Sequence, residues 1–182
     1  MLLVRHGESQ WNVPFGAVRI DAGIVDPALT GGRAQAEEAA SKLTGGGRGD
    51  ADRCQSLPAH AADGLHHCRK AGVDIEVDAL VIRERCAFSC DQGSPAEILE
   101  REWPSLDFSA LGERWWGSRI ESVRSIEKRS RTFLENAEGI VDRDGTLVVC
   151  HWGFILAVTG RSVDNAEIVR VPRRSNGTAK MK

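Results

Sequence analysis

Two histidines each follow a short apolar run, one near each end of the chain. His6 stands after residues 2–4 and directly after Arg5, and His151 stands after residues 147–150. A short apolar run is typical of a buried strand, and open α/β sheets bind ligands at the carboxyl ends of their strands. An imidazole nitrogen can act as a covalent nucleophile, and a neighbouring guanidinium can bind a phosphoryl group through paired N–H donors. One histidine at a strand end is as readily a structural residue. A second one, expected at the same edge of the sheet, indicates a shared pocket.

Small and polar residues follow each histidine. Gly7 lets the chain turn away from its strand and lets a ligand approach the backbone closely. Glu8, Ser9 and Asn12 then supply polar groups at the start of the next segment. Gly153 stands at the start of the helix expected after the second histidine. These groups are candidates for contacting a ligand held between the two histidines.

The elements that would position these residues alternate between strands and helices. We expect strands over residues 2–4, 51–57, 73–82, 146–150 and 165–171. We expect helices over residues 34–43 (N-capped by Thr30) and 59–71, from a capping box at Ser94, over 122–138, and from 152 onward. This alternation predicts an α/β fold, a three-layer α/β/α sandwich with a mainly parallel central sheet. We expect one domain over residues 1–172 and a basic, flexible tail over 173–182.

Composition limits the classes of partner. The chain has 182 residues, with 24 basic and 26 acidic side chains and a net charge of −2. No block of like charge suggests nucleic-acid binding, and no apolar run approaches the length of a membrane span or a secretion signal. The odd number of cysteines, five, favours reduced thiols over a disulfide framework. We therefore expect a cytoplasmic protein, or one inside an organelle after removal of a targeting peptide.

The motifs resemble those of the histidine phosphatase superfamily, also called the phosphoglycerate mutase-like family. Its Arg-His-Gly opening matches Arg5-His6-Gly7, and its second histidine matches His151. Its Asp-x-x-Leu-Thr-x-x-Gly-x-x-Gln-Ala segment is similar to residues 26–36, which are one residue shorter. A small-phosphatase branch of the family is similar at residues 90–93, 108–109 and 115–116. The resemblance implies a phosphoglycerate mutase-like fold over most of the chain.

The resemblance also implies a mechanism. His6 would be the nucleophile that forms a phosphohistidine, and Glu84 would be the proton donor, although its flanking arginines also suit a surface ion pair. Arg5 and His151 would neutralise the phosphoryl oxygens. The remaining phosphate-binding candidates are Ser9, Asn12 and Gly153. The mechanism requires no cofactor and no metal.

The chain departs from the family at one phosphate-binding position. Family members carry an arginine in a Ser-Pro-Leu-x-Arg-Ala segment, but the corresponding residues 54–64 lack it. Counting from Pro58 puts Ala61 in its place, next to His60. Loss of one preorganised oxyanion donor typically costs about 2.7–4 kcal/mol of transition-state stabilisation. We therefore expect a slow enzyme.

Two other functions stay open beside a phosphomonoester hydrolase. The missing arginine favours a non-catalytic phosphate-binding or structural subunit of a larger assembly that keeps the fold. A phosphoglycerate mutase uses the same residues, but the chain lacks the long insertion that such mutases carry before the proton donor. The expected substrate is a phosphorylated small molecule or a phosphoprotein, and the fold alone does not select between them.

Overall fold

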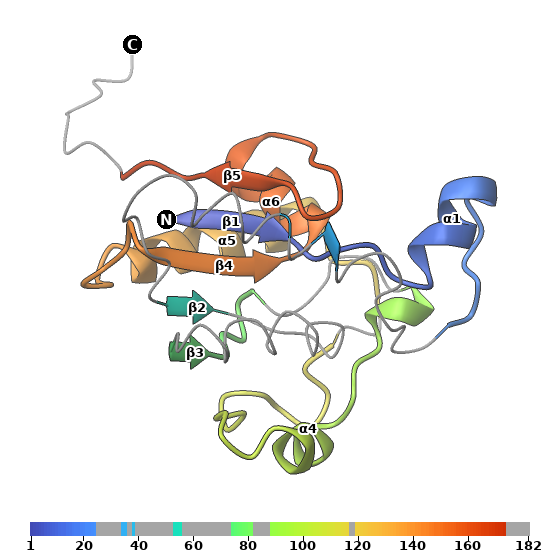
Figure 1. The fold of residues 1–182 in the computed structure, drawn as a ribbon, viewed down its shortest axis with the longest axis horizontal. Coiled ribbons are helices and arrows are strands. Elements are labelled where there is room, and N and C mark those ends of the chain that lie inside the picture. The colour runs from blue at the N-terminus through green and yellow to red at the C-terminus, as the bar shows by residue number, and fades with distance from the viewer. Residues whose placement is uncertain are drawn as a thin grey trace.

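A computed structural model of the chain describes residues 1–24, 34–35, 38, 53–55, 74–81, 88–116 and 119–173. Within these residues a five-stranded sheet has the order β3-β2-β4-β1-β5. Its strands are β1 (Leu2–Arg5), β2 (Arg53–Gln55), β3 (Asp74–Glu76), β4 (Thr146–Cys150) and β5 (Ile168–Arg170). Figure 1 shows β1 and β4 side by side at the centre of the molecule.

Strand direction places the two histidine motifs at one edge of the sheet. The described pairs β1–β4, β4–β2 and β2–β3 are parallel, whereas β5 runs antiparallel to β1. In the central pair Arg5 lies opposite Cys150, so both strands end at the same level. The described sheet is therefore mixed, and the predicted α/β class is confirmed.

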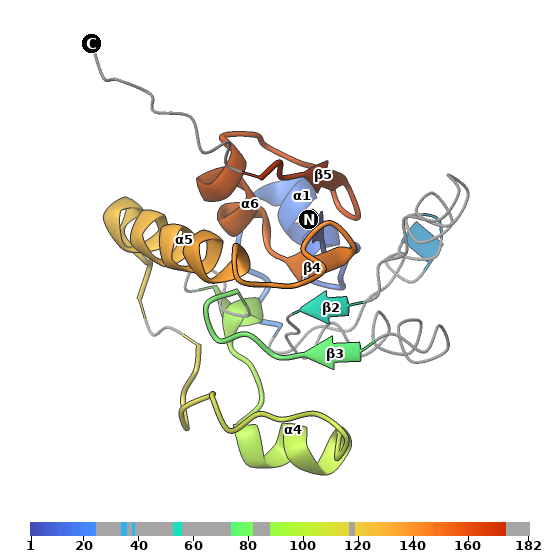
Figure 2. The ribbon, with the colours of Figure 1, turned by 90° about the vertical axis from the view of Figure 1, so that its left-hand side faces the viewer.

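Two helices cover one side of this sheet. α5 (Val123–Ala137) and α6 (Trp152–Thr159) lie on the same side in Figure 2. The short helices α1 (Asn12–Val18) and α4 (Ala96–Glu102) and the 3-10 helix η2 (Ser89–Asp91) lie further from the central strands. The helices expected over 34–43 and 59–71 fall almost wholly outside the described residues. The second helical layer of the predicted sandwich therefore stays a prediction.

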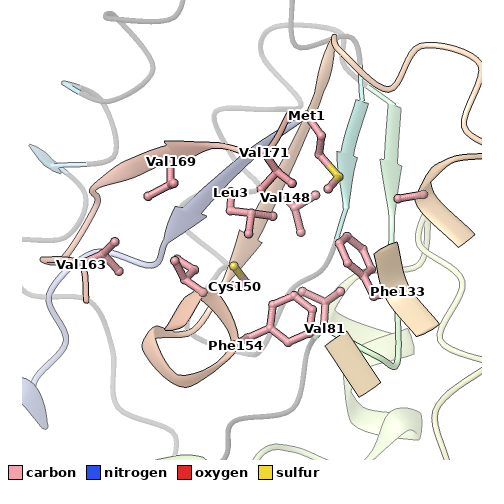
Figure 3. Close-up of a cluster of buried hydrophobic side chains, with 12 residues drawn as sticks. Met1, Leu3, Val81, Phe133, Val148, Cys150, Phe154, Val163, Val169 and Val171 are labelled. Atoms are coloured by element: carbon pink, nitrogen blue, oxygen red, sulfur yellow. The ribbon is translucent and has the colours of Figure 1, made fainter. Parts of the chain in front are cut away.

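The main core lies between the central strands and these two helices (Figure 3). Leu3 and Val148 are fully buried, and the rings of Phe133 and Phe154 meet edge to face with their centroids 5.4 Å apart. Full burial of one large apolar side chain contributes about 1.5–3 kcal/mol. This core fixes the two strands that lead into the histidine motifs. Among the described helices, none has both the length and the apolar character needed to cross a bilayer.

The third and fifth strands are shorter than predicted. β3 ends at Glu76, because Asp78 forms a turn in which its carboxylate accepts from the Leu80 backbone N–H at 2.7 Å. Val81 donates its own N–H to the Asp78 carbonyl at 3.0 Å, and it enters the core from this turn rather than from a strand. β5 begins only at Ile168, since a turn precedes it.

Helix termini agree with the sequence pattern in part. Ser122 caps α5 as expected for a helix over 122–138, accepting from the Ser125 N–H at 3.2 Å. Val123, the first residue of the helix, is 55% exposed. The capping box predicted at Ser94 is wrong: Pro95 is the N-cap of α4, with no side-chain hydrogen bond.

Candidate active site

The two histidines lie next to each other at the carboxyl ends of β1 and β4. The His6 backbone N–H donates to the Cys150 carbonyl at 3.0 Å, which continues the strand pairing by one residue. The imidazole centroids of His6 and His151 are 5.3 Å apart, with an angle of 64° between the ring planes. Residues 145 positions apart in sequence thus share one site, as the two apolar runs predict.

The hydrogen bond of the His6 ring selects one tautomer. Its Nδ1 lies 2.8 Å from the carbonyl oxygen of Gly7. Because a carbonyl oxygen only accepts, Nδ1 carries the hydrogen and donates it. A neutral ring in this state has its lone pair on Nε2, which makes Nε2 the nucleophilic atom.

His151 is the N-cap of α6 and is 4% exposed. Its carbonyl accepts the N–H of Ile155 at 3.0 Å, which closes the first turn of the helix. Gly153 is buried in that same turn. The first N–H groups of a helix have no partner within the helix and form its positive end. This end therefore lies beside the two imidazoles and suits an anion.

The loop between α6 and β5 forms hydrogen bonds to Arg5 and His6. The Arg5 Nη1 donates to the Val163 carbonyl at 3.1 Å, and its backbone N–H donates to the Glu167 carbonyl at 3.2 Å. The Ala166 N–H lies within reach of two carbonyls, those of Arg5 at 3.1 Å and His6 at 3.3 Å. The sequence reading missed this support, having placed residues 165–171 in a strand. The Asp-Asn pair at 164–165, a common turn signal, could have indicated the loop.

Ser9 and Asn12 are bonded to each other. The Oδ1 of Asn12 accepts the Ser9 backbone N–H at 2.9 Å and the Ser9 hydroxyl at 3.0 Å. It also accepts from the side-chain amide of Asn165 at 3.2 Å. Ser9 is 2% exposed. These contacts direct the Asn12 oxygen into the protein and leave its amide nitrogen as the donor that can serve a ligand.

An aspartate joins the segment after Asn12 to the residues around η2. The Asp21 carboxylate accepts the Trp11 indole N–H at 2.8 Å and both the backbone N–H and the hydroxyl of Ser89. These hydrogen bonds, those from Ser89 first, hold the pKa of Asp21 well below its usual range. Phe88 and Phe15 pack on the Trp11 ring, with centroids 5.1 and 4.3 Å away. These contacts hold the segment after Asn12 and the residues around η2 together.

Several predicted positions lie outside the described residues. They include Glu84, His60 and Ala61. One residue of the Gln-Ala segment is described: Gln35, whose side-chain oxygen accepts the Glu8 N–H at 2.8 Å and so joins this segment to the first motif. In the described part of the chain, no three His, Cys, Asp or Glu side chains gather closely enough to hold a metal ion.

An α/β sheet with two adjacent histidines at its carboxyl edge is the arrangement that the sequence motifs predict. The family model for the histidine phosphatase superfamily (branch 1) matches residues 1–179. The chain therefore belongs to the histidine phosphatase superfamily. No curated protein matches its sequence.

Solved structures show the same fold. A mycobacterial glucosyl-3-phosphoglycerate phosphatase superposes with a TM-score of 0.57 and 22% identity, over 92% of this chain and 87% of its own. The ecdysone phosphate phosphatase of Bombix mori gives a TM-score of 0.63 and 13% identity over 92% and 86%. A phosphoserine phosphatase mutant of Entamoeba histolytica in complex with phosphoserine gives 0.53 and 22% over 92% and 87%. At these identities the similarity shows the fold.

Proposed function

We propose that the protein is a phosphomonoester hydrolase that acts through a phosphohistidine intermediate on His6. The observation that carries this proposal is the pair of imidazoles 5.3 Å apart at the ends of adjacent parallel strands, with the Nδ1 of His6 bonded to Gly7. That geometry supports the role of the His6 Nε2 as the nucleophile and of the second imidazole as a phosphoryl ligand.

The first step transfers the phosphoryl group to the enzyme. The Nε2 lone pair of His6 attacks phosphorus, the P–N bond forms, and the P–O bond to the leaving group breaks. Glu84 in its protonated form gives its proton to the leaving oxygen, which departs as an alcohol. In the second step water attacks the phosphohistidine, Glu84 accepts a proton from that water, and cleavage of the P–N bond releases inorganic phosphate and restores Nε2.

The phosphoryl oxygens need positive charge and N–H donors throughout both steps. Arg5 and a protonated His151 supply charge, and the Gly153 amide at the start of α6 supplies a donor. Asn12 supplies its amide nitrogen, and Ser9 acts through Asn12, to which its hydroxyl is bonded. Protein groups thus carry the charge stabilisation, and the proposed reaction uses no metal and no cofactor.

The expected rate is low, because the family's second phosphate-binding arginine is replaced by Ala61. The proposed substrate is a phosphorylated small molecule or a phosphoprotein. The three solved relatives are named for phosphomonoesters of chemically unrelated alcohols, which supports the reaction class rather than one substrate. A cytoplasmic location, or an organelle interior, stays part of the proposal.

The same substitution favours one alternative, a non-catalytic phosphate-binding or structural subunit. Such a protein would hold an anion at Arg5 and His151 without forming a phosphohistidine. A phosphoglycerate mutase is the weaker alternative, since it would have to retain the phosphorylated intermediate and exclude water.

Hydrolysis of an aryl phosphate between pH 5 and pH 8 tests the proposal. We expect wild type to turn over slowly and His6→Ala to fall to the rate in buffer alone. His66→Ala, which removes a histidine outside both motifs, is the matched control and should keep wild-type activity. Acid-labile, alkali-stable labelling of the protein by a radioactive phosphate donor should likewise depend on His6. Equal rates for wild type and a folded His6→Ala would refute the hydrolase and favour the non-catalytic alternative.

A further inference from the structure

The loop of residues 161–167, between α6 and β5, contacts several residues of the proposed site. Its backbone bonds to Arg5 and His6, and its Asn165 side chain bonds to Asn12. The proposed chemistry assigns no role to this loop. Its contact with Asn12 indicates a role in orienting that side chain.

The loop has hydrogen bonds of its own that hold its conformation. The Glu167 carboxylate accepts the Asp164 N–H at 2.9 Å and the Arg161 guanidinium at 3.1 Å. The Ser162 hydroxyl accepts the Trp152 indole N–H at 2.9 Å, which fixes the loop to the first residue of α6. Asn165 is therefore presented to Asn12 from a structured support.

The orientation of the Asn12 amide follows from its partners. The Ser9 backbone N–H can only donate, so the Asn12 atom that faces it at 2.9 Å is the oxygen. The Asn165 atom 3.2 Å from that same oxygen must be its amide nitrogen. Three donors thus converge on one carbonyl oxygen. They favour the rotamer in which the amide nitrogen of Asn12 faces away from them.

We propose that Asn165 is a positioning residue that holds the Asn12 amide with its N–H donors turned to the phosphoryl group. This inference rests on the proposed function, which makes Asn12 a phosphate ligand. Asn165 does not itself touch the substrate. If its donor is lost, only the backbone N–H and the hydroxyl of Ser9 still hold the Asn12 oxygen, so the orientation that presents the amide nitrogen to the anion is favoured less strongly.

Asn165→Asp is the most informative variant, because it keeps the shape and replaces the donor by a carboxylate that repels the Asn12 oxygen. We expect the affinity for inorganic phosphate, measured by calorimetry at pH 7, to fall roughly ten- to hundredfold, as when a hydrogen bond to a charged group is lost. In an Asn12→Ala background the same substitution should cost much less than in wild type, because only the direct repulsion between the new carboxylate and phosphate remains. Asn136→Asp is the matched control: it makes the same charge change at an exposed residue near the end of α5, before β4 begins, and should bind phosphate like wild type.

Asn165→Ala provides a second variant that adds no charge, and it should weaken phosphate binding in the same direction by a smaller factor. Thermal unfolding of each variant separates a loss of fold from a loss of binding.

Wild-type phosphate affinity in Asn165→Asp overturns the inference, as does an equal loss of affinity with and without the Asn12 side chain. A wild-type protein that binds no phosphate overturns both this inference and the proposed function. A wild type that binds phosphate but hydrolyses no ester refutes only the hydrolase, and the loss in Asn165→Asp then still supports the positioning role.

Discussion

Arg129 and Glu121 form a buried ion pair that joins three parts of the fold. The guanidinium donates to both carboxylate oxygens, at 3.2 and 2.6 Å, and its remaining nitrogen donates to the Leu80 carbonyl at 2.6 Å. It also lies over the Phe154 ring, 5.3 Å from the centroid. The carboxylate is 3% exposed and the guanidinium 10%. One side chain of α5 thus holds the turn after β3, the segment before α5, and α6.

Removal of one partner of this pair should destabilise the protein strongly. Arg129→Met leaves the Glu121 carboxylate buried without its cation, and breaking a buried pair in this way costs about 3–5 kcal/mol. The double variant Arg129→Met, Glu121→Gln removes both charges and should recover part of that loss. Urea unfolding measures both values. Arg124→Met, an exposed arginine of the same helix, is the control and should lie within about 0.5 kcal/mol of wild type. A loss in Arg129→Met no larger than the control's would mean that the pair contributes nothing to folding.

Replacement of Ala166 by glycine should stabilise the protein. Its φ of 58° lies in the left-handed region, where a side chain costs about 1–2 kcal/mol. Ala166→Gly removes this strain and keeps the N–H that reaches the Arg5 and His6 carbonyls. Glycine loses more conformational entropy on folding than alanine, which costs about 0.5–1 kcal/mol. Because the strain removed is larger than this cost, we expect a small net gain in the free energy of unfolding. Ala157→Gly, inside α6, should shift it the other way by about 1 kcal/mol. The same sign for both variants would contradict the argument.

Asp78 should make the protein less stable as the pH rises. Burial raises the pKa of this carboxyl and outweighs the hydrogen bond from the Leu80 N–H, which lowers it. The charge of Glu76 raises the pKa further, and that of Arg129 lowers it slightly. Because the folded-state pKa is raised, the contribution of this carboxyl to stability is fully present below the unfolded pKa, about 3.9. It is lost as the pH rises through the folded-state pKa. Asp78→Asn keeps an oxygen for the Leu80 N–H. It should therefore unfold at a higher temperature than wild type at pH 7, with the difference closing toward pH 4.

Asp107 provides the control of opposite sign for that experiment. Hydrogen bonds from Ser109 lower the pKa of Asp107, so its ionised form is the stabilising one. Asp107→Asn should then be less stable than wild type at pH 7, and the difference should shrink as the pH falls below about 3.9. If the stability difference from wild type changed with pH in the same direction for both variants, burial and hydrogen bonding would not be what sets the pKa values of Asp78 and Asp107.

The central strands could be predicted because each is an uninterrupted apolar run that ends in a polar motif. Leu3 and Val148 are buried as the pattern requires, and the two histidines meet at the strand ends. The roles assigned to His6 and His151 stay predictions. The strand expected over residues 73–82 was too long, because the hydrogen bond of Asp78 to its own chain outweighs the apolar run that follows.

The support of the site could not be predicted from local pattern. Asn165 reaches Asn12 across 153 positions, and Arg129 reaches the carbonyl of Leu80 across 49. Charged and amide side chains on a helix or in a turn are usually solvated, so their sequence context gives no sign of a buried partner. These contacts arise only when the sheet brings distant segments to one edge.

Gly93 should tolerate no side chain while Trp115 is present. A Cβ built at Gly93 would overlap the six-membered ring of Trp115, whose indole N–H donates to the Ser94 carbonyl at 3.0 Å. Gly93→Ala must therefore displace the indole and break that bond. Overpacking of this kind costs about 1–3 kcal/mol, which urea unfolding would measure.

A double-variant cycle shows whether the indole is the cause. Trp115→Phe removes the ring atoms that the new methyl group would meet, so Gly93→Ala should cost much less in that background than in wild type. Gly112→Ala is the matched control, because a Cβ there meets nothing within 4 Å. It should leave stability unchanged or raise it slightly, since alanine restricts the unfolded chain. A Gly93→Ala loss that persists undiminished with Trp115→Phe would place the clash elsewhere than on the indole.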